Sequence, residues 1–249
     1  MKKINKIWEG NFSNFETALK FKRGSGFKSN KWINDQINIL NKCIQNIKHK
    51  KKISQKHTMR FRSFINILNN ILKKKKELNI LDIGGGIGIG YLYILQEIKK
   101  NIKYTIIEIP QFIKKIGKNK IKKIIYKSKI DKKKYDFVNC CSSFQYVKNW
   151  RREIKKFSYI NSDYIYFADL FAGNIKTFVT LQNYYESKIP HWFLNFEDFN
   201  NEMLKYNFRL ISKRKMITKR LKINTTLPMN NFKKSLRLPY TLNLLYKKN

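Results

Sequence analysis

Asp82-Ile83-Gly84-Gly85-Gly86-Ile87-Gly88 is the stretch that decides the fold, and it directly follows the apolar run Leu78-Asn79-Ile80-Leu81. Five of the ten glycines fall between Gly84 and Gly90, before a segment rich in Tyr, Leu and Ile. Glycine at a turn from strand to helix permits positive φ and lets a ligand approach the backbone. The free amides at the helix start then favour an electron-rich group. The pattern predicts a ligand-binding turn, and the alternative is a turn that binds nothing.

The spacing of the glycines separates three nucleotide-binding motifs. No Gly-Lys-Ser/Thr follows, which excludes a phosphate-binding loop of the Walker type. The dinucleotide fingerprint fails as well, because it would require glycine or alanine at Ile89 or at Tyr91. What remains is an acidic residue followed by three alternating glycines, and this resembles the first motif of class I S-adenosylmethionine-dependent methyltransferases. The resemblance implies S-adenosylmethionine as cofactor, with cofactor-binding residues Asp82, Gly84, Gly85, Gly86 and Gly88.

A second carboxylate, Glu108, ends the predicted strand Tyr104-Thr105-Ile106-Ile107. An acidic residue at the end of the second strand of such a sheet accepts hydrogen bonds from ribose hydroxyls. A solvated carboxylate at a strand end is the alternative. Since the chain has only 16 acidic residues, its position between Ile107 and Ile109 favours cofactor binding.

Short apolar runs alternate with basic helical stretches after Leu78, which predicts a doubly wound α/β fold with a mostly parallel, seven-stranded sheet. We expect strands near 79–83, 103–108, 122–126, 135–140, 163–169, 207–216 and 235–247. Helices are expected near 89–100, 110–118, 148–157 and 196–206. Residues 1–77 are expected to be mainly helical, starting from a capping box at Ser13-Asn14-Phe15-Glu16. The predicted organisation is an N-terminal helical extension (1–77), which covers cofactor or substrate, and a Rossmann-like domain (78–249).

The segment 135–147 is predicted to be the fourth strand and the loop that leaves its carboxyl end, where ligands bind in open α/β sheets. Ser142 is assigned to the cofactor there. Gln145 and Tyr146 either face the substrate or cap the next helix. The segment lacks Asn-Pro-Pro-aromatic and Pro-Cys, which other methyltransferase types use, so Cys140 and Cys141 are expected to be packing residues.

Methyl transfer is an in-line displacement, so a base is needed only where the acceptor must lose a proton. Asp169, at the end of the fifth predicted strand, and His191, beside Pro190 and Trp192, are the catalytic candidates. A histidine that supports an aromatic cluster is an equally good interpretation of His191. Gln182 is a weaker substrate candidate in the connection after that strand.

The net charge of +38 would suit an anionic partner such as RNA, a membrane surface or a charged glycan. The lysine runs are scattered, however, and abundant Lys, Ile and Asn together indicate A- and T-rich codons, which favours solvated faces. Three cysteines form neither a disulfide framework nor a metal site, so no metal is expected. With no signal peptide or membrane-spanning stretch, we expect a cytoplasmic protein, with peripheral membrane binding as the alternative.

The whole chain also resembles a family of bacterial methyltransferases often encoded among surface-polysaccharide genes. The landmarks, in order, are Trp8-Glu9-Gly10, Phe15, Ala18, Gly26-Phe27, Trp32, 81–85, 108–112, 142–146, Asp169, Gln182 and 190–193. Two departures are Gly88 with Gly90, where relatives more often have Gly-Ser, and the basic charge. The resemblance does not supply a substrate.

Three functions follow from these observations. The first is methylation of an oxygen or nitrogen on a small molecule or saccharide, such as a glycan precursor. The second is methylation of RNA through the basic surface. The third is a catalytically silent binding module for anionic partners. The sequence leaves the oligomeric state open.

Overall fold

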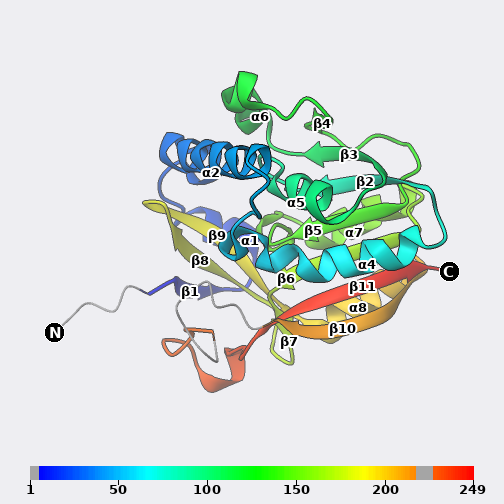
Figure 1. Cartoon of the computed structure of the whole chain (residues 1–249). Helices are drawn as coiled ribbons and strands as arrows, with labels where there is room; N and C mark the ends of the chain where they lie inside the picture. The colour runs from blue at the N-terminus through cyan, green and yellow to red at the C-terminus, as the bar shows by residue number, and fades with distance from the viewer. Residues whose placement is uncertain (1–5, 217–226) are drawn as a thin grey trace.

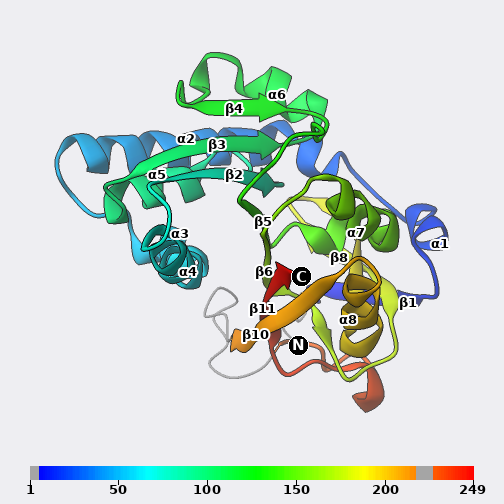
Figure 2. The same ribbon diagram turned by 90° about the vertical axis from the view of Figure 1, so that its right-hand side faces the viewer.

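Two β-sheets organise the part of the chain that the computed structural model describes, residues 6–216 and 227–249. A seven-stranded sheet forms the centre of the molecule, and a four-stranded sheet lies at one end of it (Figure 1). Helices cover both faces of the large sheet (Figure 2). The predicted doubly wound α/β fold is therefore confirmed.

The large sheet has the strand order β10-β11-β6-β5-β2-β3-β4. The strands are β2 (Glu77–Ile83), β3 (Asn101–Ile107), β4 (Ile124–Lys127), β5 (Phe137–Cys141), β6 (Tyr164–Leu170), β10 (Phe208–Met216) and β11 (Thr241–Lys248). The five strands from β6 to β4 are parallel, whereas β11 runs in the opposite direction and pairs antiparallel with both β6 and β10. All seven predicted strands are present. The last begins at Thr241 rather than 235 because a short 3-10 turn, Lys234–Leu236, precedes it.

The order of the strands reverses at β2. The chain goes from β2 outward to β3 and β4, and then returns to place β5 on the other side of β2. In open α/β sheets, ligands bind at the carboxyl ends of the strands that flank such a reversal. The glycine-rich turn leaves β2 at this position, so the topology places it where a ligand site is expected.

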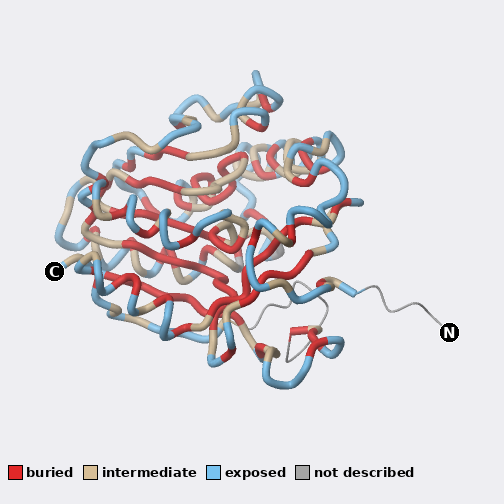
Figure 3. The backbone as a smooth tube through the Cα atoms, turned by 180° about the vertical axis from the view of Figure 1, so that it is seen from behind, coloured by how far each residue is buried: buried red, intermediate tan, exposed pale blue. Residues whose placement is uncertain are grey.

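Each face of the large sheet carries its own hydrophobic core. Because side chains alternate along a strand, Ile80 enters one core and Leu81 the other. The first core is covered by α2 (Asn30–Lys48), α4 (Arg62–Leu72), α5 (Ile89–Glu97) and α6 (Pro110–Ile116). The second core is covered by α7 (Trp150–Tyr159) and α8 (Phe196–Leu204). Buried residues predominate along β5 and β6 (Figure 3), so both faces of the sheet are covered there.

The four-stranded sheet has the order β1-β8-β9-β7 and was not predicted. Its members are β1 (Trp8–Phe12), β7 (Ala172–Gly173), β8 (Phe178–Tyr184) and β9 (Ser187–Asn195). A two-residue turn joins β8 to β9, and both of its residues, Tyr185 and Glu186, have positive φ, 46° and 62°. Such turns strongly prefer Asn-Gly or a similar pair, so Tyr-Glu gave no hairpin signal. The segment expected to be a connection is therefore a hairpin.

The N-terminal segment contains β1 followed by several helices, which are separated by nonhelical connections at residues 20–25 and 49–54. Helix α1 (Phe15–Leu19) is capped by Asn14, whose side chain accepts a hydrogen bond from the Thr17 amide. The expected cap, Ser13, lies one residue too early, because Asn14 is the residue whose oxygen reaches that amide at 2.8 Å. The helices α2 and α4 confirm the expectation that residues 1–77 are mainly helical, and α3 (Gln55–Thr58) with the turn Met59–Phe61 lies between them.

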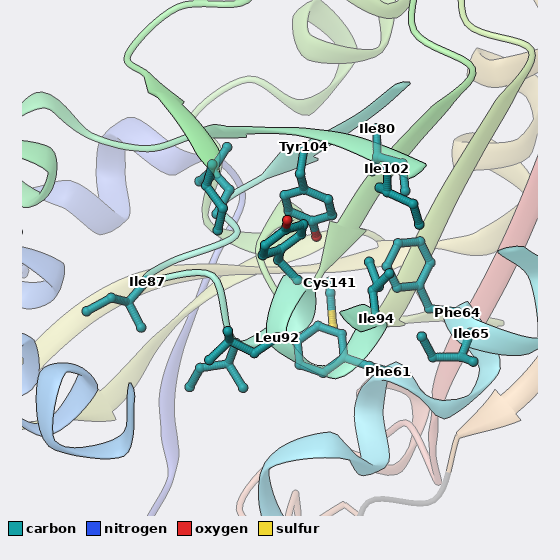
Figure 4. Close-up of a cluster of buried hydrophobic side chains, with 14 of the residues drawn as sticks. Phe61, Phe64, Ile65, Ile80, Ile87, Leu92, Ile94, Ile102, Tyr104 and Cys141 are labelled. Carbon is teal, nitrogen blue, oxygen red and sulfur yellow. The ribbon is translucent and has the colours of Figure 1, made fainter. Parts of the chain in front are cut away.

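Helix α4 is held to the sheet by Phe64, which is fully buried. Its ring lies 5.4 Å from that of Phe137 on β5 and 6.3 Å from that of Tyr166 on β6. Figure 4 shows Phe64 and Ile65 beside Ile94 of α5. These contacts bind the N-terminal helices to the core of the large sheet.

We expect Phe64→Ala to lower the free energy of unfolding by about 3–5 kcal/mol, because it removes a buried ring and leaves a cavity. Tyr159→Ala is the matched control, since that side chain is 62% exposed and its loss should cost at most about 0.5 kcal/mol. Denaturant unfolding of both variants measures the difference. Equal losses would contradict the docking of α4 through Phe64.

Candidate active site

The glycine-rich turn connects β2 to α5 at the carboxyl edge of the large sheet. Gly84, Gly86 and Gly88 have φ values of 69°, 59° and 90°, a region that residues with a Cβ rarely adopt. The Gly84 amide donates to the Ile107 carbonyl at 2.8 Å, which fixes the turn to the end of β3. Gly88 is the N-cap of α5. Alternating glycines are therefore required by the path of the backbone.

Three glycines of the turn are enclosed and one is open. A Cβ on Gly84 would lie 2.5 Å from Ser143, one on Gly85 2.4 Å from Asp82, and one on Gly88 2.4 Å from Ile124. A Cβ on Gly86 would meet nothing within 4 Å. The turn thus packs tightly against the protein on its other sides and leaves free space at Gly86, where a ligand can approach the backbone.

Asp82 lies beneath this turn and is 2% exposed. Its Oδ2 accepts a hydrogen bond from the Tyr104 hydroxyl at 2.6 Å, and its Oδ1 accepts one from the Asn139 amide at 2.8 Å. Burial raises the pKa of Asp82 to about 6, against the lowering effect of these two hydrogen bonds. The carboxylate therefore supports the turn from below, between β3 and β5.

Glu108 lies directly after β3 and faces the turn. Its Oε1 accepts a hydrogen bond from the Gly86 amide at 3.0 Å, and its Oε2 accepts one from the Ile109 amide at 3.1 Å. Burial raises the pKa of Glu108 to about 7, although both amide hydrogen bonds act to lower it. The structure thus brings Glu108 together with the open glycine of the turn.

Ser142 and Asp169 lie at the ends of the adjacent strands β5 and β6. Both have positive φ, 52° and 56°, and the Ser142 hydroxyl donates to Asp169 Oδ2 at 2.8 Å. Left-handed backbone at non-glycine residues costs free energy and is concentrated at functional sites. The strain marks this part of the carboxyl edge as a candidate acceptor region beside the glycine-rich turn.

Three residues of this edge were missed by sequence reasoning. Ser143 donates from its hydroxyl to the Ile83 carbonyl at 2.6 Å and packs on Gly84. Thr241 donates to Asp169 Oδ1 at 2.7 Å, and the Asn243 side chain accepts a hydrogen bond from the Asp169 amide at 2.9 Å. Thr241 and Asn243 lie on β11, more than 70 residues away in sequence, where no local pattern indicates the contact.

Tyr146 and Gln182 form a direct contact between the loop after β5 and the β8–β9 hairpin. The Tyr146 hydroxyl donates to Gln182 Oε1 at 2.6 Å. Gln145, in the same 3-10 turn, Phe144–Tyr146, is 2% exposed. Of the weak substrate candidates, Tyr146 and Gln182 are therefore brought together.

His191 lies on β9 inside a cage of aromatic rings and is fully buried. Ring centroids lie 6.0 Å away for Trp8, 5.3 Å for Tyr146, 4.5 Å for Phe171 and 5.1 Å for Phe193. Neither ring nitrogen of His191, nor Nε1 of Trp8, has a hydrogen-bond partner of good geometry. Burial lowers the pKa of His191 to about 3, so its ring is neutral at physiological pH.

Aromatic side chains continue from this cage to the N-terminal helices. The Phe27 ring lies 4.8 Å from Tyr146 and 5.3 Å from Trp32, and the Trp32 ring lies 5.1 Å from Phe112 of α6. Trp32 Nε1 donates to the Tyr184 hydroxyl at 3.1 Å. The segment that enters α2 is thus attached both to the hairpin and to the helix that follows Glu108.

Two other properties concern metals and membranes. Within residues 6–216 and 227–249, no group of three or more His, Cys, Asp or Glu side chains is arranged to hold a metal ion. None of the helices described there combines the length and the apolar character needed to span a bilayer.

Comparison with known proteins adds a family and a fold. Residues 56–213 match the family model described as "Methyltransferase domain". A Burkholderia thailandensis 1,6-didemethyltoxoflavin-N1-methyltransferase, solved with 1,6-didemethyltoxoflavin and S-adenosylhomocysteine, is similar at a TM-score of 0.52 and 11% identity, over 76% of this chain and 78% of that one. A Methanosarcina mazei S-adenosylmethionine-dependent methyltransferase is similar at a TM-score of 0.50 and 15% identity, over 73% of this chain and 96% of that one. No curated protein matches the sequence.

The raised pKa of Glu108 generates a prediction about stability. Between its ordinary value of 4.5 and about 7, the unfolded chain holds the carboxylate charged while the folded protein keeps it protonated. The wild type therefore loses stability from this group as pH rises through that interval. The Glu108→Gln side chain is uncharged at every pH. The melting temperature of this variant minus that of the wild type should therefore increase from about pH 5 to pH 8. A difference that does not change with pH would contradict the burial of this charge.

Proposed function

The chain belongs to the family of methyltransferase domains, and on this premise we propose that it transfers the methyl group of S-adenosylmethionine to an oxygen or nitrogen of a small molecule or saccharide. The observation that carries the proposal is the convergence of the open glycine, Gly86, with the carboxylate of Glu108 at the strand reversal. A glycine-rich turn and an acidic strand end at this position are the two parts that an adenosyl ligand needs.

The residues at the turn fit this cofactor. Free space at Gly86 leaves room for the ligand against the backbone. Glu108 offers two acceptor oxygens, which suit a pair of ribose hydroxyls. Its burial also means that the charged carboxylate gains by acquiring new hydrogen-bond donors. The bound cofactor supplies a methyl group that is electrophilic because it is attached to a positively charged sulfur.

The remaining cofactor candidates act by shaping the turn. Asp82 fixes the turn from below through Tyr104 and Asn139, and Gly84 and Gly85 allow it to approach Ser143 and Asp82 closely. Ser142 orients the neighbouring strand end by donating to Asp169. Holding reactants in a fixed geometry is the main contribution that a protein makes to an in-line displacement.

On the acceptor side we assign different roles to Asp169 and His191. Asp169 accepts hydrogen bonds from two hydroxyl groups and lies at the carboxyl end of β6, so we assign it the role of the base that takes the proton from an acceptor hydroxyl. His191 is fully buried, neutral at physiological pH and enclosed by aromatic rings, so we assign it a positioning role through the ring of Tyr146, which it contacts. A small acceptor is supported by the Burkholderia thailandensis methyltransferase of similar fold, which was solved with 1,6-didemethyltoxoflavin bound. RNA binding would instead depend on phosphate contacts.

The N-terminal segment covers this site in the proposed enzyme. Phe27 and Trp32 connect the hairpin to α6, which starts directly after Glu108. Exclusion of water strengthens electrostatic interactions and protects reactive groups. We assign residues 24–48 this covering role.

Among small acceptors, the proposal of a saccharide rests on the resemblance of the chain to methyltransferases encoded in surface-polysaccharide gene clusters.

Calorimetry with S-adenosylhomocysteine tests the cofactor site. Gly86→Ala places a methyl group in the space proposed for the ligand, and we expect binding to weaken at least tenfold, about 1.4 kcal/mol. Gly117→Ala is the matched control, because Gly117 also has positive φ, 43°, and an open Cβ position. Both variants carry backbone strain, but only the first should lose affinity. Equal affinities in the two variants, or no binding by wild type, would reject the site.

The pKa of Glu108 predicts how this binding depends on pH. Only the charged carboxylate can accept from two hydroxyls, and with a pKa of about 7 its charged fraction falls steeply under acidic conditions. The affinity for S-adenosylhomocysteine should therefore fall about tenfold from pH 8 to pH 6. In Glu108→Gln, binding should be weak and nearly independent of pH. A wild-type affinity that stays constant over this range would remove the role given to Glu108.

A further inference from the structure

A hollow lies on the four-stranded sheet, on the side of β1 opposite the aromatic cage. Its volume is about 350 Å³, and it is lined by residues of β1, the turn after α1, β8 and β9: Glu9, Gly10, Lys20, Phe21, Lys22, Arg23, Leu181 and Lys188. Neighbouring residues of β1 separate the two regions. Trp8 contacts His191, whereas Glu9 pairs with Lys188 in the hollow. The hollow is therefore distinct from the proposed methyl-transfer site.

The charge of the lining is strongly positive. Four cationic side chains face one carboxylate, Glu9, and that carboxylate is already paired with Lys188. Among the residues that the structure describes, no carboxylate lies within ion-pair distance of Lys20, Lys22 or Arg23. The positive charge of these three side chains is therefore available to attract an anionic ligand.

The segment that carries the cations is fixed in place. Arg23 exchanges two backbone hydrogen bonds with Lys188, at 3.3 and 2.9 Å, and the Lys22 amide donates to Leu19 at 3.2 Å. Fixed main-chain positions lower the entropy lost when the side chains converge on a ligand. This attachment, together with the concave surface, distinguishes the hollow from the scattered lysines elsewhere on the chain.

The hollow also offers an apolar surface. Phe21 is 55% exposed, and its ring lies 5.2 Å from that of Phe12. Arginine and lysine side chains bind the oxygens of a phosphate group. An exposed aromatic ring can pack against an apolar or planar part of the same ligand. The volume lies within the range of about 300–1,000 Å³ that small ligands occupy. We propose that this hollow is a second binding site, for a soluble small molecule that carries a phosphate group.

The test uses the full chain and inorganic pyrophosphate, with backbone amide chemical shifts as the readout. We expect saturable shifts at Gly10, Arg23 and Gly24. In the double variant Lys22→Gln with Arg23→Gln, the affinity should fall at least tenfold. The control, Lys50→Gln with Lys52→Gln, removes the same charge from the exposed loop after α2 and should bind like wild type.

Three results would overturn the proposal. One is the absence of saturable shifts in the hollow. Another is an equal loss of affinity in the control, which would show that only the overall charge matters. The third concerns the source of the phosphate: cosedimentation with phosphatidylglycerol vesicles, lost in the Lys22 and Arg23 variant, would assign the hollow to a lipid headgroup. Binding of S-adenosylhomocysteine serves as an independent check, because it should be unchanged in both double variants.

Discussion

The carboxylate of Asp82 is the interaction on which the rest of the site depends. It is almost fully buried and joins three parallel strands, because Tyr104 comes from β3 and Asn139 from β5. Burying a carboxylate is costly unless its oxygens are hydrogen-bonded. The same side chain fills the space beneath Gly85, so it fixes both the ends of the strands and the start of the turn. The position of Gly86 against Glu108 follows from this arrangement.

The geometry of the proposed cofactor site was predictable because its signals are local. Alternating glycines after an apolar run indicate the turn, and Glu108 ends the next strand, which must lie beside β2 in a parallel sheet. The seven strands of the large sheet follow from the same alternation of apolar runs and helices. Asp82 has a role in this region that the motif did not predict. Its hydrogen bonds with Tyr104 and Asn139 support the turn from inside the protein, and its assignment to the cofactor stays a prediction.

The geometry of the proposed acceptor site was less predictable because its contacts join distant segments. Asp169 is held by Thr241 and Asn243 on the last strand, and its positive φ has no signature in the sequence. The hairpin that carries His191 turns at Tyr185-Glu186, a pair that normally disfavours such a turn. The shift of the cap from Ser13 to Asn14 is a smaller error of the same kind, since either side chain can cap a helix and only the backbone path decides.

The pairing of β1 with β8 has a consequence for how the protein is made. Trp8 belongs to a strand whose partner, Gln182, is more than 170 residues further along the chain. During synthesis the amino end emerges first, and it has no partner until the hairpin has followed. Closing so long a loop lowers the chain entropy before the contacts between β1 and β8 can stabilise the pair. The wall of the aromatic cage can therefore be completed only after the hairpin of β8 and β9 has been synthesised.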